Sequence, residues 1–408
     1  MSKFILYSLL LFSIQVQLLL GEQALPIVTL DNVSHFVRKQ NPDLAAARML
    51  IKEASGRLAQ SGRLSNPELQ SSIEHNSRLR EGRIEIGISQ KFPITNRLQL
   101  EKDVSLSELE AAKAEVRETE RKLIGRSLEL VVNLQASRER RKLLSELIGV
   151  STEFAEFLNK AAEKGVGSTL DAGQAKLETA ILSVEIPQLQ AREAALMGEL
   201  KPLLGMRISD PMYVGGDLGD PTLPTKDLKP AMRPDLKAAT LTSQAASQQV
   251  ELEKARRYAD VEGGLFFAGE RAEDAPGGYE DEAIIGFQFK IALPLWDKNE
   301  GAIQEAKARK KRKDLEVDAL RRNINLAAQS TRDEMTKWKR LIEEIDETLL
   351  PLAEQQTKFA EEAYRNGQGE IQSVLRTREK RLQLAASKLD ALKEFHLARV
   401  RHKTALGR

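Results

Sequence analysis

The chain has 408 residues, of which 41% are hydrophobic, 30% are charged and only 5% are aromatic. This composition is too apolar for a disordered chain, and the excess of charged over aromatic residues is typical of long solvated helices. The formal net charge of +2 gives no surplus of cations to neutralise nucleic-acid phosphates. The sequence contains no cysteine, which excludes disulfides, thiolate metal sites, a catalytic thiol and lipidation of an N-terminal cysteine.

The N-terminus has the pattern of a secretory signal peptide. A basic start at Lys3 is followed by a mostly apolar run over 4–20 and by small residues over 21–24. We therefore predict that 1–24 is a signal peptide. The alternative is an uncleaved anchor, because about 17 apolar residues is near the lower limit for a membrane-spanning helix. No later stretch approaches that limit, so a membrane location would not depend on transmembrane helices.

Three landmarks occur twice in the same order, which predicts a tandem duplication. Asn41-Pro-Asp-Leu44 recurs as Arg233-Pro-Asp-Leu236, Phe92-Pro-Ile94 as Leu293-Pro-Leu295, and Glu163-Lys-Gly-Val-Gly167 as Arg365-Asn-Gly-Gln-Gly369. The second and third landmarks are 72 residues apart in the first copy (Pro93 to Gly165) and 73 in the second (Pro294 to Gly367). We predict a first repeat over 25–205, a linker rich in Pro and Gly over 206–232, and a second repeat over 233–408.

Each repeat is expected to contain a helix, two strands, a very long helix, a tight glycine turn and a return helix. The strands are predicted at about 67–93 and 259–294, and the long helices at about 96–164 and 299–366. Along the second long helix, one seam of mostly apolar residues follows alternating three- and four-residue steps from Val317 to Phe359, which is the period of a coiled coil. Pro351 is expected to kink this helix, and Asp297 and Asn299 to cap it.

The strands show the other period. Apolar residues that alternate with mostly polar ones are Ile84, Ile86, Ile88, Ile285, Phe287, Phe289 and Ile291. Such alternation is typical of a membrane barrel strand and also of a soluble sandwich with one wet face, and the strands alone do not decide between them. The signal peptide and the long helices favour lipid on the apolar face. Loops are expected over 78–82 and 270–280. Four strands cannot close a barrel, and open edges are not tolerated in lipid, so several chains must assemble.

These features together resemble the outer-membrane factor family, the TolC-like ducts of tripartite efflux pumps and type I secretion. The resemblance runs from about residue 41 to the end. Its most specific segments are Lys164-Gly-Val-Gly-Ser-Thr-Leu-Asp171 and Tyr364-Arg-Asn-Gly-Gln-Gly369, at the two predicted helix–helix turns. The segment Leu293-Pro-Leu-Trp-Asp-Lys-Asn-Glu-Gly-Ala302 looks like the heavy-metal efflux branch of the family.

The resemblance implies a mostly α fold with a membrane β-barrel. Three identical chains would contribute four strands each to one barrel, above a periplasmic tunnel of antiparallel coiled-coil helices. It also implies a place in the outer membrane of a Gram-negative-type envelope, with a large periplasmic portion. The implied partners are a periplasmic adaptor (membrane fusion) protein, an inner-membrane transporter of the RND or ABC type, and outer-membrane lipid.

The resemblance also suggests functional residues at the turns. Adaptor docking is expected at Gly165, Val166, Gly167, Ser168, Thr169, Gly367, Gln368 and Gly369. The glycines of these turns are also expected to end the helices by C-capping, whether or not an adaptor docks there. Drug-exporting relatives carry aspartates just inside the second turn, where this chain has Ser373 and Arg376. Asp171 has the corresponding place in the first repeat, so these three residues form the candidate entrance ring.

Three further residues of the strand region have open interpretations. Trp296, after the last strand, fits either a ring at the membrane–water interface or a core position. Lys91 and Lys290, on the polar strand faces, would either line the lumen or extend to the interface.

The sequence contains no pattern that predicts catalysis. It has no phosphate-binding loop, no dinucleotide fingerprint and no pair of histidines at metal-ligand spacing. We predict no enzyme activity, no cofactor, no metal site and no nucleic-acid partner. The predicted function is a passive outer-membrane exit duct for small molecules or metal ions, with energy from the partner transporter. The alternative is a periplasmic coiled-coil adaptor or scaffold. The cargo and the transporter class remain open.

Overall fold

The structure, a computed structural model, describes residues 26–224, 233–274 and 276–407, so the predicted signal peptide lies outside the described residues. The chain divides into two compact units. We call Met1–Pro42, Glu120–Leu228 and Ala328–Ala405 the hairpin unit. We call Asp43–Thr119, Lys229–Ala327 and Leu406–Arg408 the strand unit. No described helix is long and apolar enough to cross a membrane.

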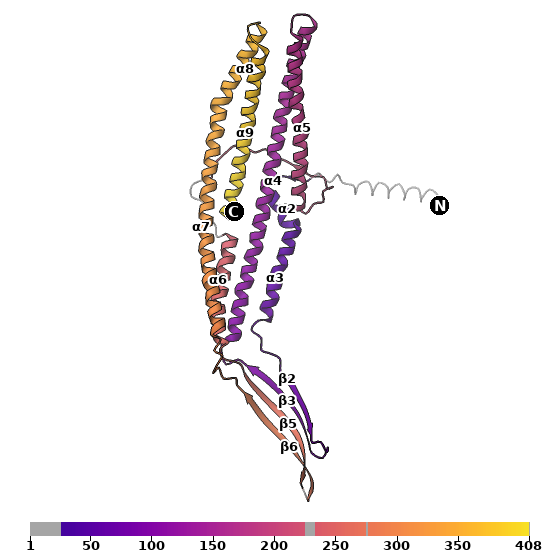
Figure 1. Cartoon of the computed structure of the whole chain (residues 1–408), viewed down its shortest axis with the longest axis vertical. Helices are drawn as coiled ribbons and strands as arrows, with labels where there is room; N and C mark the ends of the chain where they lie inside the picture. Colours follow the sequence, from indigo (N-terminus) through magenta and orange to yellow (C-terminus); the bar gives the residue numbers. More distant parts are fainter. Residues whose placement is uncertain (1–25, 225–232, 275, 408) are drawn as a thin grey trace, which may run out of the picture. The chain divides into compact units, whose positions relative to one another are not determined.

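The strand unit contains one antiparallel sheet in the order β2-β3-β5-β6 (Figure 1). Its strands are β2 (Glu68–His75), β3 (Gly82–Phe92), β5 (Val261–Asp274) and β6 (Gly278–Lys290). The second strand of the first repeat therefore pairs with the first strand of the second repeat. This leaves β2 and β6 as the two edges, each with unpaired backbone groups along one side.

The predicted loop over 270–280 is wrong. β5 continues to Asp274 and β6 begins at Gly278, with pairing as far as the turn. Arg271 and Asp281 lie opposite each other in the ladder and form an ion pair of 2.7 Å. Opposite charges across an antiparallel pair stabilise it, which explains why a segment rich in charge continues as strand.

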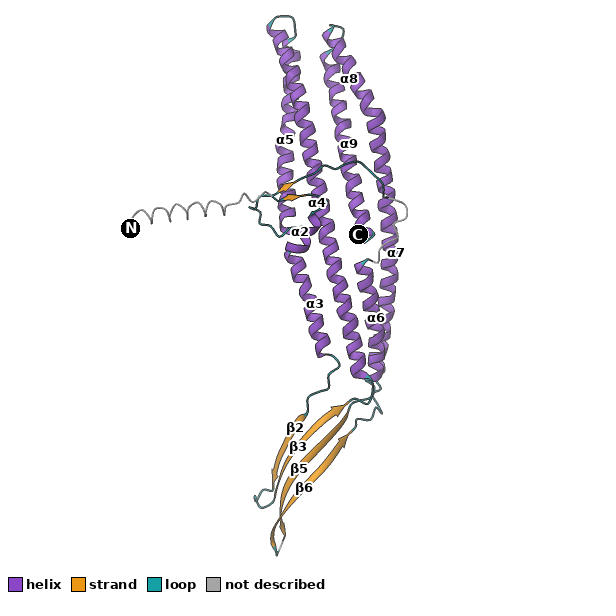
Figure 2. Ribbon diagram, turned by 180° about the vertical axis from the view of Figure 1, so that it is seen from behind, coloured by secondary structure: helices purple, strands orange, loops and turns teal. Residues whose placement is uncertain are grey.

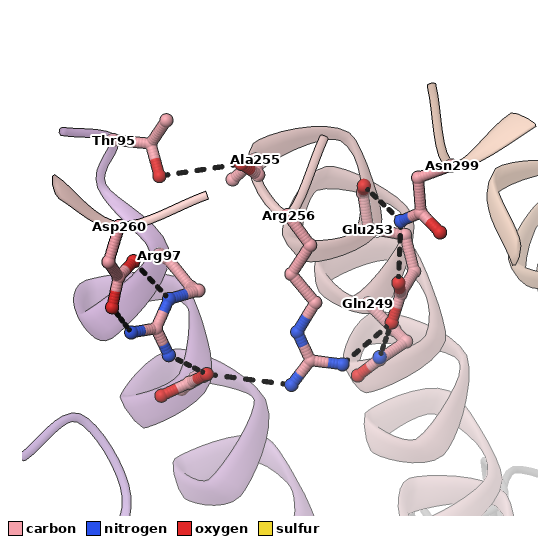
Figure 3. A network of polar contacts seen from close by, with 9 residues as sticks. Thr95, Arg97, Gln249, Glu253, Ala255, Arg256, Asp260 and Asn299 are labelled. Atoms are coloured by element: carbon pink, nitrogen blue, oxygen red, sulfur yellow. Dashed lines mark hydrogen bonds and ion pairs between the residues drawn. The ribbon is translucent and has the colours of Figure 1, made fainter. Parts of the chain in front are cut away.

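The helices of the strand unit are α3 (Pro42–Gln60), α6 (Pro234–Ala255) and the first parts of α4 (Arg97–Glu163) and α7 (Glu300–Glu344). A polar network joins the start of α4 and the end of α6 to the residues just before β5 and α7 (Figure 3). Arg97, at the start of α4, pairs with Asp260, just before β5, at 2.7 Å and with Glu101 at 2.7 Å. Arg256, after α6, bridges Glu101 and Glu253. The network therefore fixes the directions in which the chain enters and leaves the sheet.

Asn299 has a different role from the predicted cap. Its backbone has a positive φ of 57°, and its side-chain amide donates to the carbonyl oxygen and to the carboxylate of Glu253, at 2.8 and 3.0 Å. Asp297 accepts from the Asn299 backbone N–H at 2.8 Å. The side chain of Asn299 thus joins the start of α7 to the end of α6, which is a tertiary contact that local capping rules do not include.

The hairpin unit consists mainly of two antiparallel helix pairs (Figure 2). The first pair is the later part of α4 with α5 (Thr169–Leu203), and the second is α8 (Leu350–Arg365) with α9 (Ile371–Ala405). Within this unit α4 and α9 lie between α5 and α8 in both views (Figures 1 and 2). Ion pairs and packing agree, because Arg140 of α4 pairs with Asp390 of α9 at 3.6 Å, and Val132 clusters with Val400.

A π-helical turn interrupts the second long helix, where a kink was expected. The turn covers Ile345–Leu349, and the N–H of Leu350 donates to the carbonyl of Ile345, five residues earlier. Pro351 follows at once, and proline cannot accept the ordinary helical geometry because its ring clashes with the carbonyl four residues earlier. At the π turn this hydrogen bond spans five residues instead of four.

The predicted seam is only partly right. Ile324 and Ile345 are buried, but ahead of the turn the buried residues are Met335 and Ile342, each one residue after a predicted member of the seam. Beyond the turn, Leu352 and Phe359 are 52% and 54% exposed in the single chain. Thr357 is the buried residue in this part of α8. The predicted residues Leu352 and Phe359 therefore lie on the exposed side of α8.

The start of the described chain and part of the predicted linker form a small structure that the sequence analysis missed. β1 (Ile27–Val28) pairs in parallel with β4 (Tyr213–Val214). Val28 and Val214 are buried with residues of α4 and α5. The side-chain amide of Gln135 donates to the carbonyl of Gly215 at 2.8 Å. Residues 206–224 are therefore packed, at least in part, against the hairpin unit, while 225–232 lie outside the described residues.

Candidate functional site

The apolar face of the sheet is the first candidate site. The register places Ile84, Ile86 and Ile88 directly opposite Gly269, Phe267 and Leu265, which in turn lie opposite Ala283, Ile285 and Phe287. Directly opposed residues share a face. All seven predicted lipid-facing residues are between 51% and 77% exposed, and Ile291 lies one residue beyond β6. In the described part of the chain, this face is left open.

The opposite face of the sheet is polar and more covered. Ser89 is buried on β3, whereas its apolar neighbour Ile88 is exposed. Lys91 pairs with Glu68 at 2.8 Å, and Lys290 lies opposite Glu262 in the ladder. A soluble sandwich buries its apolar face and wets its polar face. This sheet does the reverse within one chain. Trp296 is 94% exposed, so it is not part of the core of a single chain.

The two hairpin tips, 165–169 and 367–369, form the second candidate site. Gly165 and Gly367 have positive φ values of 72° and 70°. In both tips the glycine N–H and the N–H that follows it donate to carbonyl oxygens of the last helical turn. In the first tip Gly165 donates to Ala162 and Val166 to Ala161. In the second tip Gly367 donates to Tyr364 and Gln368 to Ala363. Both tips are Schellman motifs with the same spacing.

The second glycine of each tip is needed for a different reason. A Cβ on Gly167 would lie 2.9 Å from the Cβ of Ala161, and one on Gly369 would lie 3.1 Å from the backbone nitrogen of Tyr364. The turns therefore fold back tightly on their own helices. Val166 points away from them and is 80% exposed. Ser168 caps α5 by accepting from the N–H of Asp171 at 3.3 Å, and Thr169 is the first residue of that helix.

Asp171 joins the two tips. The hydroxyl of Tyr364, on α8, donates to Oδ2 of Asp171, on α5, at 2.9 Å. Burial, with the hydrogen bond to Asp171, raises the pKa of Tyr364 to about 12. Of the other predicted entrance residues, Ser373 donates its N–H to the carbonyl of Glu370, and Arg376 is exposed on α9. The sequence analysis missed Tyr364 as a partner, although it belongs to the second tip segment.

Behind the tips, the four helices pack into one cluster. Phe154 and Leu158 of α4 contact Ala172 and Ala175 of α5 and Ile371 and Val374 of α9. The guanidinium of Arg378 lies 4.1 Å above the ring of Phe154 and pairs with Glu361 at 2.7 Å. A cation over an aromatic face is attracted to the ring. The two hairpins are therefore held together by a hydrogen bond at the tips and by this mixed cluster below them.

Known proteins resemble the chain along most of its length. The family model described as "Outer membrane efflux protein" matches residues 33–199 and 230–408. The chain belongs to this family.

Members of this family are outer-membrane channels with a large periplasmic portion and not enzymes. As a member, the chain is an outer-membrane efflux channel of a tripartite pump. Such channels are homotrimers that work with an adaptor protein and an inner-membrane pump.

Individual relatives agree with this assignment. The cobalt-zinc-cadmium resistance protein CzcC of Cupriavidus metallidurans is 21% identical over 396 residues, covering 93% of this chain and 87% of that protein. The outer membrane protein VceC of Vibrio cholerae has the same fold, with a TM-score of 0.75 at 19% identity over 93% of this chain and 96% of that one. The structure of CusC gives a TM-score of 0.74 at 17% identity over 95% of both chains. The TolC-like fold inferred from the sequence is confirmed.

A half-buried carboxyl near the tips makes the stability of this region depend on pH. Burial, with the nearby charge of Glu379, raises the pKa of Glu178 above its ordinary value. A raised carboxyl pKa means that the ionised form opposes the packed tip, and protonation relieves this as the pH falls.

We therefore expect Glu178→Gln to stabilise the protein at neutral pH by up to about 1 kcal/mol, since the site is partly screened by solvent. The advantage should disappear as the pH falls through the titration of the Glu178 carboxyl, because the parent then becomes neutral as well. Thermal unfolding in detergent at several pH values measures this. Glu156→Gln, at an exposed position of α4, is the matched control and should change little. An equal effect of both substitutions at all pH values would contradict the assignment.

Proposed function

We propose that three copies of this chain close one barrel through the edge strands of their sheets. Within one chain the strands alternate in direction, so β6 of one copy and β2 of the next are antiparallel neighbours without any reversal. Closure removes both open edges, which lipid requires because no water is present to satisfy the backbone. The observation that carries the proposal is the exposed apolar face, which lipid would cover.

The polar face would then line a wet passage. One row across the sheet places Glu74, Arg83, Glu270 and Glu282 opposite one another. Arg83 contacts Glu85 at 2.7 Å and Glu270 at 3.9 Å. Lys91 and Lys290 lie on the same face, nearer the helices. Charged side chains on this face are consistent with a hydrated interior, where water solvates them.

The tips are proposed as both gate and docking site. The bond between Tyr364 and Asp171 holds the two hairpins together, and movement of one hairpin against the other would widen the entrance. Asp171 would contribute to an entrance ring, with Ser373 and Arg376 beyond it. The exposed residues of tips 165–169 and 367–369 would contact the adaptor, and an RND or ABC transporter would supply the energy. The protein itself would need no catalytic group, cofactor or bound metal.

The proposed cargo is divalent metal cations. This rests on the likeness to the cobalt-zinc-cadmium resistance protein and on the strand exit that resembles the heavy-metal branch. Other small molecules are the alternative outcome of the experiments below.

Spin labels on neighbouring residues test the orientation of the sheet. Labels at Ile86 and Phe287 should be accessible to oxygen from the bilayer and not to a water-soluble nickel complex, because these positions would face hydrocarbon. Labels at Glu85 and Gln288, one residue away on the opposite face, should show the reverse. Aqueous exposure at Ile86 and Phe287 in reconstituted trimers would rule out the barrel.

Removal of one hydroxyl tests the gate. Tyr364→Phe deletes the hydrogen bond to Asp171, which is partly exposed, so we expect a loss of about 1 kcal/mol and about a fivefold gain in the open fraction. Conductance in planar bilayers should rise accordingly. Tyr258→Phe, the same change at a residue of the strand unit, should leave conductance unchanged. Equal conductance of parent and Tyr364→Phe would show that this bond does not hold the entrance closed.

Complementation tests docking and cargo together. A host that lacks the protein should become sensitive to Co²⁺, Zn²⁺ or Cd²⁺, and the parent gene should restore growth. Val166→Lys should not restore it although trimers still form, because an exposed tip residue then carries an unpaired charge at the proposed contact. Ile208→Lys, at a residue 75% exposed outside the tips, should restore it fully. No metal sensitivity would contradict the cargo, and full rescue by Val166→Lys would contradict docking through this tip.

A further inference from the structure

Phe266 is an exception on the polar face of the sheet. Three other phenylalanines of β5 and β6, Phe267, Phe287 and Phe289, lie on the apolar face and are between 55% and 77% exposed. Phe266 precedes Phe267 by one residue, so its side chain lies on the opposite face, where it is half-buried. In the proposed barrel that face lines the passage, and Phe266 is the largest apolar side chain of the four strands there.

The ring of Phe266 leans across the sheet onto β6. Gly87 of β3 and Gly286 of β6 both lie directly opposite Phe266. A Cβ added to Gly286 would lie 2.2 Å from Cζ, 2.4 Å from Cε1 and 3.0 Å from Cε2 of the Phe266 ring. A strand side chain ordinarily stands roughly perpendicular to its sheet. The ring instead occupies the space in which a side chain at position 286 would begin, so it lies flat against the sheet.

The second glycine leaves the other side of Phe266 open. A Cβ on Gly87 would lie 3.1 Å from the Cβ of Phe266, and no ring atom is among its three nearest neighbours. Neither Gly87 nor Gly286 has a positive φ, so the backbone conformation does not require glycine at either position. What the two glycines provide is space beside Phe266, on both sides of it.

The neighbouring row of the same face repeats this arrangement in the other direction. Gln288 of β6 lies directly opposite Gly264 of β5. A Cβ on Gly264 would lie 2.9 Å from both Cγ and Nε2 of Gln288, so this side chain leans toward β5. Two successive rows therefore pair a long side chain with a glycine, and both long side chains lie along the sheet.

Contact with the backbone of β6 favours the flat position of the ring. It removes one face of the Phe266 ring from water, which stabilises that position through the hydrophobic effect. An aromatic side chain that covers a glycine on the next strand also helps to fix the register of a sheet. The ring is therefore stable in this position as long as the glycines beside it remain.

We propose that Gly87 and Gly286 set the width of the barrel passage at the level of Phe266, because they let its ring lie against the wall. The inference rests on the proposed barrel and names the residues that limit the size of the solute that passes it. In three copies related by a rotation axis along the barrel, the three rings lie at one level. A ring displaced from the wall narrows the passage at that level, and the diameter of a pore decides which solutes pass.

A single cysteine beyond the ring measures this width, and the sequence has no other cysteine. Lys290 is exposed on the same face, four residues along β6 from Gly286 and about 14 Å closer to α7. The proposed passage opens to the cell exterior at the end of the sheet away from the helices. In intact cells, a polyethylene-glycol maleimide too large for general porins therefore reaches Lys290→Cys only past Phe266.

The test variant adds Gly87→Ala and Gly286→Ala to Lys290→Cys, which closes both spaces beside the ring. The largest maleimide that labels Lys290→Cys alone should label the test variant at least about ten times more slowly, because the displaced ring extends into the passage. A small methanethiosulfonate should label both at the same rate. Further addition of Phe266→Ala should restore labelling by the large maleimide, since no ring is left to be displaced.

The matched control adds Gly263→Ala and Gly269→Ala to Lys290→Cys. These glycines lie on the apolar face, and a Cβ on either would meet no neighbouring atom closer than 3.7 Å. The control should be labelled like Lys290→Cys alone. Phe266→Ala together with Lys290→Cys tests the flat position without any added side chain. It should change labelling by the large maleimide by less than about twofold, because a ring against the wall does not narrow the pore.

The outcomes separate this inference from the proposed channel. Equal labelling of the test variant and of Lys290→Cys by every maleimide would overturn the inference and leave the channel intact. The same would follow if Phe266→Ala failed to restore labelling of the test variant. If the test variant does not assemble, a clear gain in labelling with Phe266→Ala alone would show that the ring projects into the passage and would overturn the inference. A cysteine at position 290 that no external reagent labels before denaturation would overturn both proposals.

Discussion

The alternation of side chains along four strands is the constraint on which the rest of the structure depends. It collects isoleucines and phenylalanines on one face of the sheet and charged residues on the other, and in a single chain it is the apolar face that stays exposed. Such a sheet cannot be stable in water alone. In the proposed barrel, lipid covers this face and other copies complete the hydrogen bonds of β2 and β6. Assembly is therefore a physical requirement of this chain.

The duplication meets this requirement in a simple way. Each repeat supplies a strand pair and a helix pair. The repeats are not identical, however. In the second one a π turn lies directly ahead of Pro351. Leu352 and Phe359, which follow it, lie on the exposed side of α8.

The sheet and the hairpin tips depend on different kinds of interaction. The sheet offers a polar lining with charges that water can solvate. The tips depend on backbone geometry, because glycines at positive φ end the helices and let the hairpins turn sharply. One hydrogen bond between Tyr364 and Asp171, over a small apolar cluster with Arg378 above Phe154, connects the hairpins. A few contacts of modest strength are consistent with the gate that we propose at the tips.

The sequence by itself determined the two periods, the duplication, the glycine turns and hence the family, because each depends on residues close together in the chain. It could not determine that Asp171 bonds to a tyrosine 193 residues away, that Asn299 bonds to Glu253 instead of capping its own helix, or that β1 pairs with β4. It also placed the seam of the long helix one residue away from the buried Met335 and Ile342, because a pattern of threes and fours does not show which side of a long helix its neighbours cover. Those features depend on how distant segments pack, and only the tertiary structure decides that.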